Sequence, residues 1–275
     1  MDKFEKEYFD ELKNLAPKYK NQIHEIAKNR IKMFSAAVAR QLITEKKQFD
    51  LIIGPGNSGL VMTKLASFVY EELSINKPPE LNLPVQRVIE ENDVTGVFKL
   101  SNDYLEKLKG FGHVSNILFV DDEIMRATTA RECFEALIKM NPNIKHLNVT
   151  IIAENHFFEW HYEILNVSVK FYAYARLIQG LNGIIGYFIS DDLYNEAIEF
   201  IEDINDYNDL MALIVGGALK RVRNNESYYD FEVEKVLEEK IKDYPKRKEV
   251  LIEELKSLVK QGVEEYKKGE IKFRF

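Results

Sequence analysis

The sequence is poor in cysteine and contains no long hydrophobic run. Cys133 is the only cysteine in 275 residues, so an internal disulfide is excluded and a reducing compartment is favoured. No stretch of uncharged residues approaches the length of a transmembrane helix. The charged first residues, 1–10, lack the apolar core of a signal peptide. We therefore expect a cytoplasmic protein that does not enter a membrane.

An excess of basic residues is also missing. The chain has 38 Lys and Arg against 45 Asp and Glu, which gives a net charge of −7. Proteins that bind long nucleic acid usually cluster Lys and Arg on one surface, whereas here the basic residues are scattered among acids. Long nucleic acid is therefore not an expected partner. Small phosphorylated ligands remain possible, because backbone amides hold phosphate without a net positive charge.

The hydrophobic pattern divides the chain into three segments. Residues 1–48 carry apolar residues at helical spacing. In residues 49–178 short apolar runs alternate with helical stretches, which predicts an α/β core with a mainly parallel sheet flanked by helices. Residues 179–275 are predicted to be helical, and their many acids are typical of solvated helix faces. The helical ends are expected to contact a second copy of the chain or a partner protein.

Strands are predicted at five places in the middle segment. They are 50–54, 85–89, 116–120, 147–153 and 167–174. In a parallel sheet ligands bind at the carboxyl ends of the strands. The segments that follow the first and third strands, 54–59 and 121–129, are therefore predicted to lie on the same edge.

The segment after strand 116–120 carries the most specific chemistry. Asp121 and Asp122 stand at the end of this strand, and a helix is predicted to begin near Thr128. The first amides of a helix have no intrahelical partners, and with the helix dipole they form an anion site. The hydroxyls of Thr128 and Thr129 add donors, while the carboxylates can accept hydrogen bonds from sugar hydroxyls. One loop can thus hold a sugar and its phosphate.

This segment resembles the binding loop of type I phosphoribosyltransferases, in which an apolar strand and two acids precede a Thr-Gly-rich turn. The resemblance covers residues 49–178. It implies that Asp121 and Asp122 hold the ribose hydroxyls and that Arg126-Ala127-Thr128-Thr129 cradle the 5-phosphate. It also implies transfer of a phosphoribosyl group from phosphoribosyl pyrophosphate to a nucleobase, with release of pyrophosphate. Mg²⁺ would bridge substrate oxygens and would reach Asp121 and Asp122 only through water.

A glycine-rich segment one strand–helix unit earlier adds to the resemblance. Residues 54–59 fall where the family has its pyrophosphate loop, and the candidate contacts are Gly56, Asn57, Ser58 and Gly59. Such turns occur in many folds. This segment supports the resemblance only because it lies one strand–helix unit before the acids. Residues 90–115, polar and irregular, fall where the family has its mobile catalytic loop.

The sequence also departs from the family. Arg126-Ala127 stands in place of the Thr-Gly pair, and glycine matters there because it tolerates positive φ and lets a phosphate approach the backbone. Arg126 either supplies a guanidinium to the phosphate or faces solvent. Met125 occupies the position of the acidic base of some purine-specific members, so no general base can be assigned. These departures keep open a regulatory or accessory protein that binds a phosphoribosyl ligand or nucleotide without turnover.

The acid pair allows two other interpretations. The same strand and acids look like the opening of a response-regulator receiver domain, but neither later strand ends in the required Asp: the residues there are Glu154-Asn155 and Ala175-Arg176. Alternatively, the acids only stabilise the start of a helix. The phosphoribosyl site is the preferred interpretation, although the motif does not identify the acceptor base.

Overall fold

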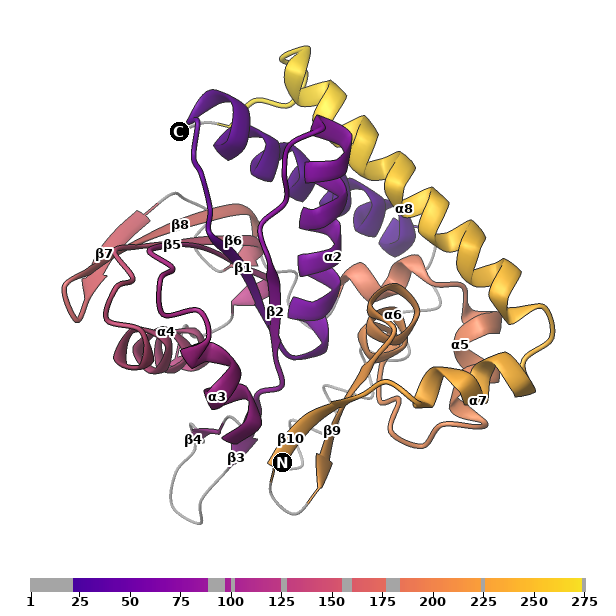
Figure 1. Ribbon diagram of the computed structural model, residues 1–275. Coiled ribbons are helices and arrows are strands. Elements are labelled where there is room, and N and C mark those ends of the chain that lie inside the picture. The colour runs from indigo at the N-terminus through magenta and orange to yellow at the C-terminus, as the bar shows by residue number, and fades with distance from the viewer. Residues whose placement is uncertain are drawn as a thin grey trace, which may run out of the picture.

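A six-stranded sheet forms the centre of the computed structural model (Figure 1). The structure describes residues 22–88, 97–99, 102–124, 128–154, 160–176, 184–223 and 226–273. Its strands are β1 (Leu51–Pro55), β2 (Glu80–Leu83), β5 (Asn116–Ile124), β6 (His146–Glu154), β7 (Trp160–Ile164) and β8 (Val167–Arg176). The strand order is β2-β1-β5-β6-β8-β7, and all neighbours are parallel except β7 and β8. The predicted α/β fold with a mainly parallel sheet is confirmed.

The prediction placed four strands of this sheet correctly and one wrongly. Residues 85–89 do not join it: β3 (Gln86–Val88) pairs with β4 (Val97–Lys99) in a separate antiparallel pair. The neighbour of β1 is instead the short strand β2. Only Leu81 and Leu83 of β2 are buried, so its apolar pattern was too short to detect. The antiparallel edge strand β7 was also missed.

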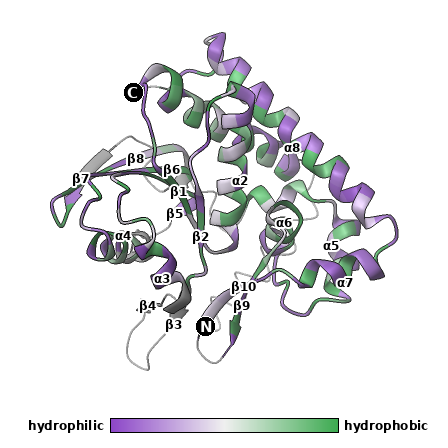
Figure 2. Ribbon diagram, viewed as in Figure 1, coloured by the Kyte–Doolittle hydropathy of each residue, from purple (hydrophilic) through white to green (hydrophobic). Residues whose placement is uncertain are grey.

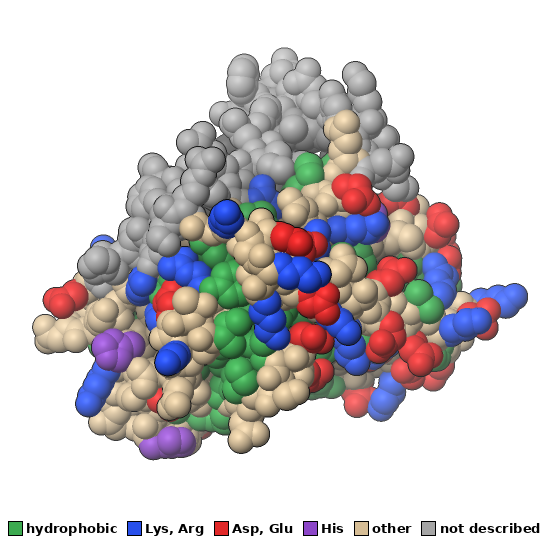
Figure 3. Space-filling model, turned by 90° about the horizontal axis from the view of Figure 1, so that it is seen from above, with side chains coloured by type: hydrophobic (Ala, Val, Ile, Leu, Met, Phe, Trp, Pro, Cys, Tyr) green, Lys and Arg blue, Asp and Glu red, His purple; other side chains and the backbone are tan. Residues whose placement is uncertain are grey.

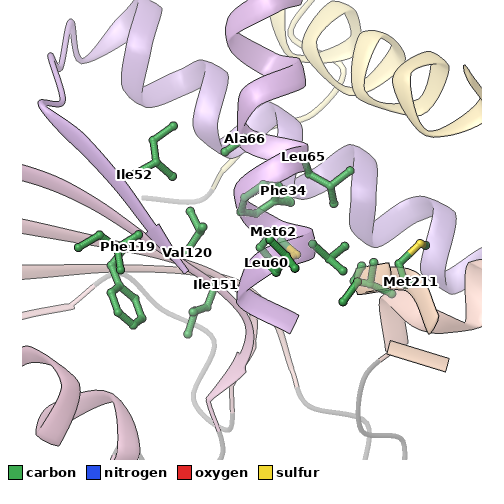
Figure 4. Close-up of a cluster of buried hydrophobic side chains, with 14 of the residues drawn as sticks. Phe34, Ile52, Leu60, Met62, Leu65, Ala66, Phe119, Val120, Ile151 and Met211 are labelled. Atoms are coloured by element: carbon green, nitrogen blue, oxygen red, sulfur yellow. The ribbon is translucent and has the colours of Figure 1, made fainter. Parts of the chain in front are cut away.

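The central strands are apolar along their length because helices cover both faces of the sheet. α2 (Gly56–Leu73) lies on one face, and α3 (Asn102–Lys109) and α4 (Thr128–Met140) lie on the other (Figure 1). Ile52 and Val120 point toward Met62 of α2, whereas Phe119 points the opposite way (Figure 4). There the Phe119 ring meets Phe134 of α4 with 4.8 Å between centroids.

The C-terminal part packs on the α2 face. It contains η2 (Ile184–Phe188), α5 (Asp191–Ile198), α6 (Tyr207–Gly216), α7 (Val233–Lys240) and α8 (Tyr244–Lys267). A hairpin of β9 (Leu219–Arg223) and β10 (Glu226–Asp230) interrupts these helices, which the prediction of a helical region did not include. One buried apolar cluster runs from Ala27 to Val263, so the three predicted segments share a core.

The two long helices at the ends of the chain also cover α2. Residues 22–39 are helical and lead into a π-helical turn, η1 (Arg40–Thr44). α8 is amphipathic, with an apolar stripe and a hydrophilic outer side (Figure 2). Leu251, Leu255 and Leu258 of this stripe are buried. None of the helices in the described ranges has both the length and the apolar character of a membrane span.

Candidate ligand site at the carboxyl edge of the sheet

The connections that follow β1 and β5 run in opposite directions across the sheet. α2 leads from β1 outward to β2, and α4 leads from β5 the other way to β6. Because such crossovers are right-handed, α2 and α4 cover opposite faces of the sheet (Figure 1). The carboxyl ends of β1 and β5 thus form a topological switch point, the place where open α/β sheets bind ligands. Both segments singled out in the sequence begin there.

The first of these segments is a tight strand-to-helix junction and not the predicted loop. β1 extends through Pro55 and α2 begins at once with Gly56, which has a φ of +63° in the region that favours glycine. Gly54 and Gly59 lie against each other: a Cβ on Gly59 would come within 2.4 Å of the Gly54 carbonyl carbon. This close approach leaves no room for the loop expected at 54–59.

Ser58 joins the start of α2 to the acids in the last part of β5, which continues through Ile124 and so extends beyond the predicted strand end at 120. Its hydroxyl donates to Asp121 Oδ1 at 2.8 Å, and the backbone N–H of Asp122 donates to the same oxygen at 2.9 Å. The two predicted segments therefore lie on the same edge of the sheet, as expected. We refer to Asp121, Asp122 and residues 56–59 together as the acid-pair site.

Asp122 is the more deeply placed of the two acids, with 6% of its surface exposed. Its Oδ1 accepts from the Glu123 N–H at 2.8 Å, and its Oδ2 accepts from Asn208 Nδ2 at 3.0 Å. Burial and the neighbouring charge of Asp122 raise the pKa of Asp121 well above the usual carboxyl range, and burial also raises the pKa of Asp122. The pair is thus suited to hold a proton, a cation or sugar hydroxyls.

Residues of the C-terminal part close over the start of α2. Asn57 Nδ2 donates to Asp209 Oδ1 at 2.5 Å, and Asn57 Oδ1 accepts from the backbone N–H of Lys220 at 2.8 Å. Lys220 Nζ donates to the Val85 carbonyl at 3.1 Å. Burial lowers the pKa of this ammonium group, although nearby acids oppose the shift. A partly buried cation thus lies beside the segment predicted to meet pyrophosphate.

None of these C-terminal partners was predicted as a site residue. Asn208 and Lys220 follow no motif in the sequence, and Asp209 belongs to the acid run at 191–209 that was interpreted as solvated helix surface. That interpretation holds for Asp192 and Glu199, which are exposed, but Asp209 is half-buried against Asn57. One local signal could have marked these residues. It is the Asp-Tyr-Asn-Asp run at the start of a helix, where Asp206 is the N-cap.

The predicted phosphate cradle falls mainly outside the described residues. Arg126 and Ala127 are not among them, and nor is Met125. Thr128 and Thr129 open α4, as the prediction of a helix start near Thr128 requires, but their side chains are not described. Their contacts with a phosphate stay a prediction.

The segment predicted as a mobile catalytic loop is partly regular. Residues 90–115 include β4 and α3. Tyr104 and Leu108, four residues apart on α3, are both buried, which is the spacing of a helix packed on its neighbours. The polar composition of this segment hid that short apolar stripe.

The acid-pair site offers carboxylates for a metal ion but no complete cage. Within the described ranges, no three His, Cys, Asp or Glu side chains are grouped so that they could hold a metal ion. Mg²⁺ is commonly bound by one or two carboxylates, with water and substrate phosphates completing its shell. Asp121 and Asp122 fit this mode of binding.

Asn208→Ala is expected to lower the free energy of unfolding by about 2 kcal/mol, because it leaves one oxygen of the buried Asp122 carboxylate without its donor. Urea denaturation measures this change. In the double variant with Asp122→Asn the loss should be smaller than the sum of the single losses. Additive losses would show that this hydrogen bond contributes nothing to stability.

Comparisons with known proteins give partial structural likeness alone. No protein-family model matches the chain, and no curated protein matches its sequence. A hypothetical protein from Neisseria gonorrhoeae with bound ppGpp is 18% identical over 53% of this chain and 79% of its own, with a TM-score of 0.38. A purine phosphoribosyltransferase from Pyrococcus horikoshii is 19% identical over 54% and 83%, with a TM-score of 0.35. A Staphylococcus aureus hypoxanthine phosphoribosyltransferase is 12% identical over 55% and 75%, with a TM-score of 0.38. Scores this low carry no functional conclusion.

Proposed function

We propose that the protein binds phosphoribosyl pyrophosphate at the acid-pair site and transfers its phosphoribosyl group to a nucleobase or related acceptor, releasing pyrophosphate. The observation that carries the proposal is the position of Asp121 and Asp122 at the switch point, hydrogen-bonded to the first turn of α2. A sugar diol needs acceptors, and phosphates need unpaired amides at the positive ends of helices. In this proposal the acids supply the acceptors and the first turns of α2 and α4 supply the amides.

Each part of the site has a role in this proposal. Asp121 and Asp122 accept hydrogen bonds from the ribose 2- and 3-hydroxyls, the first amides of α4 hold the 5-phosphate, and residues 56–59 hold the pyrophosphate. Lys220 adds a positive charge beside Asn57. Asp121 and Asp122 would hold Mg²⁺ through water, where it would supply positive charge to the phosphates.

Catalysis then comes mainly from position and charge. As pyrophosphate departs, positive charge develops on the sugar carbon, and the carboxylates of Asp121 and Asp122 lie at the ribose to stabilise it. The helix ends keep the two substrates aligned, so that the reaction proceeds within one complex. Asn208 acts as a positioning residue, because it holds the Asp122 carboxylate, and the Ser58 hydroxyl holds that of Asp121.

A second function, binding without turnover, is favoured by one observation. Both oxygens of Asp122 already accept protein hydrogen bonds, from the Glu123 N–H and from Asn208. A sugar hydroxyl has to share or replace one of them. Arg126-Ala127, which stands in place of the Thr-Gly pair of the family turn, also favours binding without turnover. The alternative is therefore an accessory protein that holds a phosphoribosyl ligand or nucleotide.

Release of pyrophosphate distinguishes the two functions. We expect the wild type, supplied with phosphoribosyl pyrophosphate and Mg²⁺, to release pyrophosphate with at least one member of a panel of purines, pyrimidines and orotate. Calorimetry on the same samples reports ligand affinity. Affinity without turnover would favour the accessory protein. The absence of both affinity and turnover would eliminate both functions and leave the acids a structural role.

The Arg126-Ala127 pair gives a matched variant for this assay. The double change Arg126→Thr and Ala127→Gly restores the family turn. If the protein is an enzyme, turnover should stay within about tenfold of the wild type, or roughly 1.4 kcal/mol of barrier. Turnover gained only in the double variant would show that the natural loop had given up catalysis.

A further inference from the structure

A second candidate site lies at the opposite edge of the sheet. An open cavity of about 630 Å³ lies between η1 and the end of α8 with the residues that follow it. Residues 45–50 lead from η1 into the amino end of β1, whereas the acid-pair site follows its carboxyl end (Figure 1). We call it the basic cavity. It is separate from the acid-pair site and does not depend on the proposed function.

The charge of the basic cavity is unusual for this chain. Its described lining includes Arg40, Lys267, Lys268 and Lys272 and contains no Asp or Glu, in a protein with a net charge of −7. Lys267 and Lys268 stand at the end of α8, where cations stabilise the helix dipole. Arg40 and Lys272 come from other segments, so helix capping does not account for the whole group. Seen from above, Lys and Arg side chains are interspersed with Asp and Glu around exposed apolar ones on this face of the molecule, so the one-sign lining is a local feature (Figure 3).

A second cavity shows that such a lining is not general. This cavity, of about 710 Å³, is lined by Lys242, Lys246 and Arg247, but Glu196 and Glu254 lie beside them. Arg247 Nη1 is paired with Glu196 at 2.8 Å. Its charges are therefore largely balanced, whereas the charged residues that line the basic cavity are all cations, of which Arg40 is paired with Glu45 behind it.

The guanidinium of Arg40 is held in place before any ligand binds. Its Nε lies 3.0 Å from Glu45 Oε1, and its side chain is only 14% exposed. The guanidinium carbon is 5.7 Å from the centroid of the Phe273 ring and 5.9 Å from that of Tyr172. A guanidinium fixed between two rings loses little freedom when its planar group binds a phosphate.

Two aromatic rings give the basic cavity an apolar wall. The Tyr266 and Phe273 rings are 6.0 Å apart at an angle of 37°, and both are partly exposed. The Tyr266 hydroxyl is hydrogen-bonded to Thr44 Oγ1 at 2.5 Å, and Phe273 packs edge-on against Tyr174. The rings are thus held at fixed positions beside the cations. This combination suits a ligand that has both a flat ring and several negative charges.

We propose that the basic cavity binds a nucleoside polyphosphate. The phosphates contact Arg40, Lys268 and Lys272, and the base lies against Tyr266 and Phe273. The cavity volume falls in the range of about 300–1,000 Å³ that is usual for small-molecule sites. A simple phosphate can contact only the cations, and an unphosphorylated nucleoside can contact only the rings. Each of them should therefore bind more weakly than the complete nucleotide.

The test is calorimetry in the Asp121→Asn background, which removes the acid-pair site as a competing site. ATP, GTP and UTP are titrated separately, with pyrophosphate and adenosine as fragments. We expect one triphosphate per chain to bind more tightly than either fragment. Lys268→Glu with Lys272→Glu should weaken it at least about tenfold, because two attractive charges become repulsive. Phe273→Leu should weaken the nucleotide but not pyrophosphate.

The matched control is Lys242→Glu with Lys246→Glu, which makes the same charge change at the other cavity and should leave the affinity unaltered. Circular dichroism confirms folding of each variant. If the double glutamate variant is unfolded, Lys268→Ala with Lys272→Ala replaces it and should still reduce affinity. Three results would each overturn the proposal. They are an equal loss of affinity in the Lys242→Glu, Lys246→Glu control, unchanged affinity in the Lys268→Glu, Lys272→Glu variant, and no binding of any triphosphate to the Asp121→Asn protein.

Discussion

Asp121→Asn is expected to stabilise the protein above neutral pH and at the same time to weaken its binding of phosphoribosyl pyrophosphate. Two adjacent carboxylates share a largely buried place, which raises the pKa of Asp121 well above the usual carboxyl range. Asparagine removes the charge but keeps an oxygen that accepts from Ser58. By urea denaturation at pH 8, we expect the free energy of unfolding to rise by about 1–3 kcal/mol.

The pH dependence of this gain has a definite sign. A carboxyl group whose pKa is higher in the folded than in the unfolded protein holds its proton more tightly when folded. It adds stability below the pKa of the unfolded chain, about 4, and this contribution is lost as the pH rises through the folded pKa. The difference between Asp121→Asn and the wild type should therefore be largest at pH 8 and shrink toward pH 4.

Asp50→Asn is the matched control, because the same chemical change should have the opposite effect. Although partial burial raises the pKa of Asp50, hydrogen bonds from the Ser115 and Asn116 backbone N–H groups, both 2.9 Å long, bring it below its ordinary value. This carboxylate stabilises the fold above the unfolded pKa, and its contribution is lost as the pH falls through the folded pKa. Asp50→Asn should cost about 1–2 kcal/mol at pH 8. A gain from both substitutions would contradict the assignment.

The expected loss of ligand affinity in Asp121→Asn comes from the loss of the Asp121 charge. A hydrogen bond from a sugar hydroxyl to a carboxylate is stronger than one to an amide, and a metal ion held through water needs the charge as well. We expect the affinity for phosphoribosyl pyrophosphate with Mg²⁺ to fall about 100-fold, or roughly 2.7 kcal/mol. Calorimetry on the folded, stabilised variant measures it. A variant that is more stable and binds normally would leave the acid pair without a role in this ligand's binding.

The strands that carry the site could be predicted because each is a continuous apolar run. Leu51 to Ile53 and Ile117 to Val120 are at most 1% exposed, as strands covered on both faces must be. Asp121 and Asp122 follow this apolar run, but β5 continues through Ile124 and Asp121 still pairs with Ile151 of β6, so the strand was predicted to end too early. The short edge strand β2 gave no comparable signal.

The partners of the acids could not be predicted from local pattern. Asn208 lies 86 residues beyond Asp122, and nothing in its neighbours marks it for burial. Asp209 has the same local surroundings as the solvated acids before it, yet it binds Asn57. These contacts arise from the packing of α6 on α2, which depends on the whole chain and leaves no periodic trace around either residue.

Gly59→Ala is expected to destabilise the protein by about 3 kcal/mol or more, because overpacking against backbone cannot be relieved by a rotamer change. A Cβ on Gly59 would lie 2.4 Å from the Gly54 carbonyl carbon and 2.5 Å from Pro55 Cδ. Gly112→Ala is the control: its Cβ would meet only Lys109 O, at 3.4 Å, so its effect should stay within about 0.5 kcal/mol. Urea denaturation compares the two.

This substitution also separates two reasons for the glycines at the start of α2. The resemblance made Gly56 and Gly59 candidate contacts for pyrophosphate, whereas the structure shows that Gly54 and Gly59 are needed for the strand end and the helix to touch. If packing is the reason, Gly54→Ala should be as damaging as Gly59→Ala, and the double change should cost less than the sum, because either Cβ alone already forces the two segments apart. A Gly59→Ala protein with wild-type stability but no affinity for phosphoribosyl pyrophosphate would show instead that the ligand, and not the fold, requires glycine at this position.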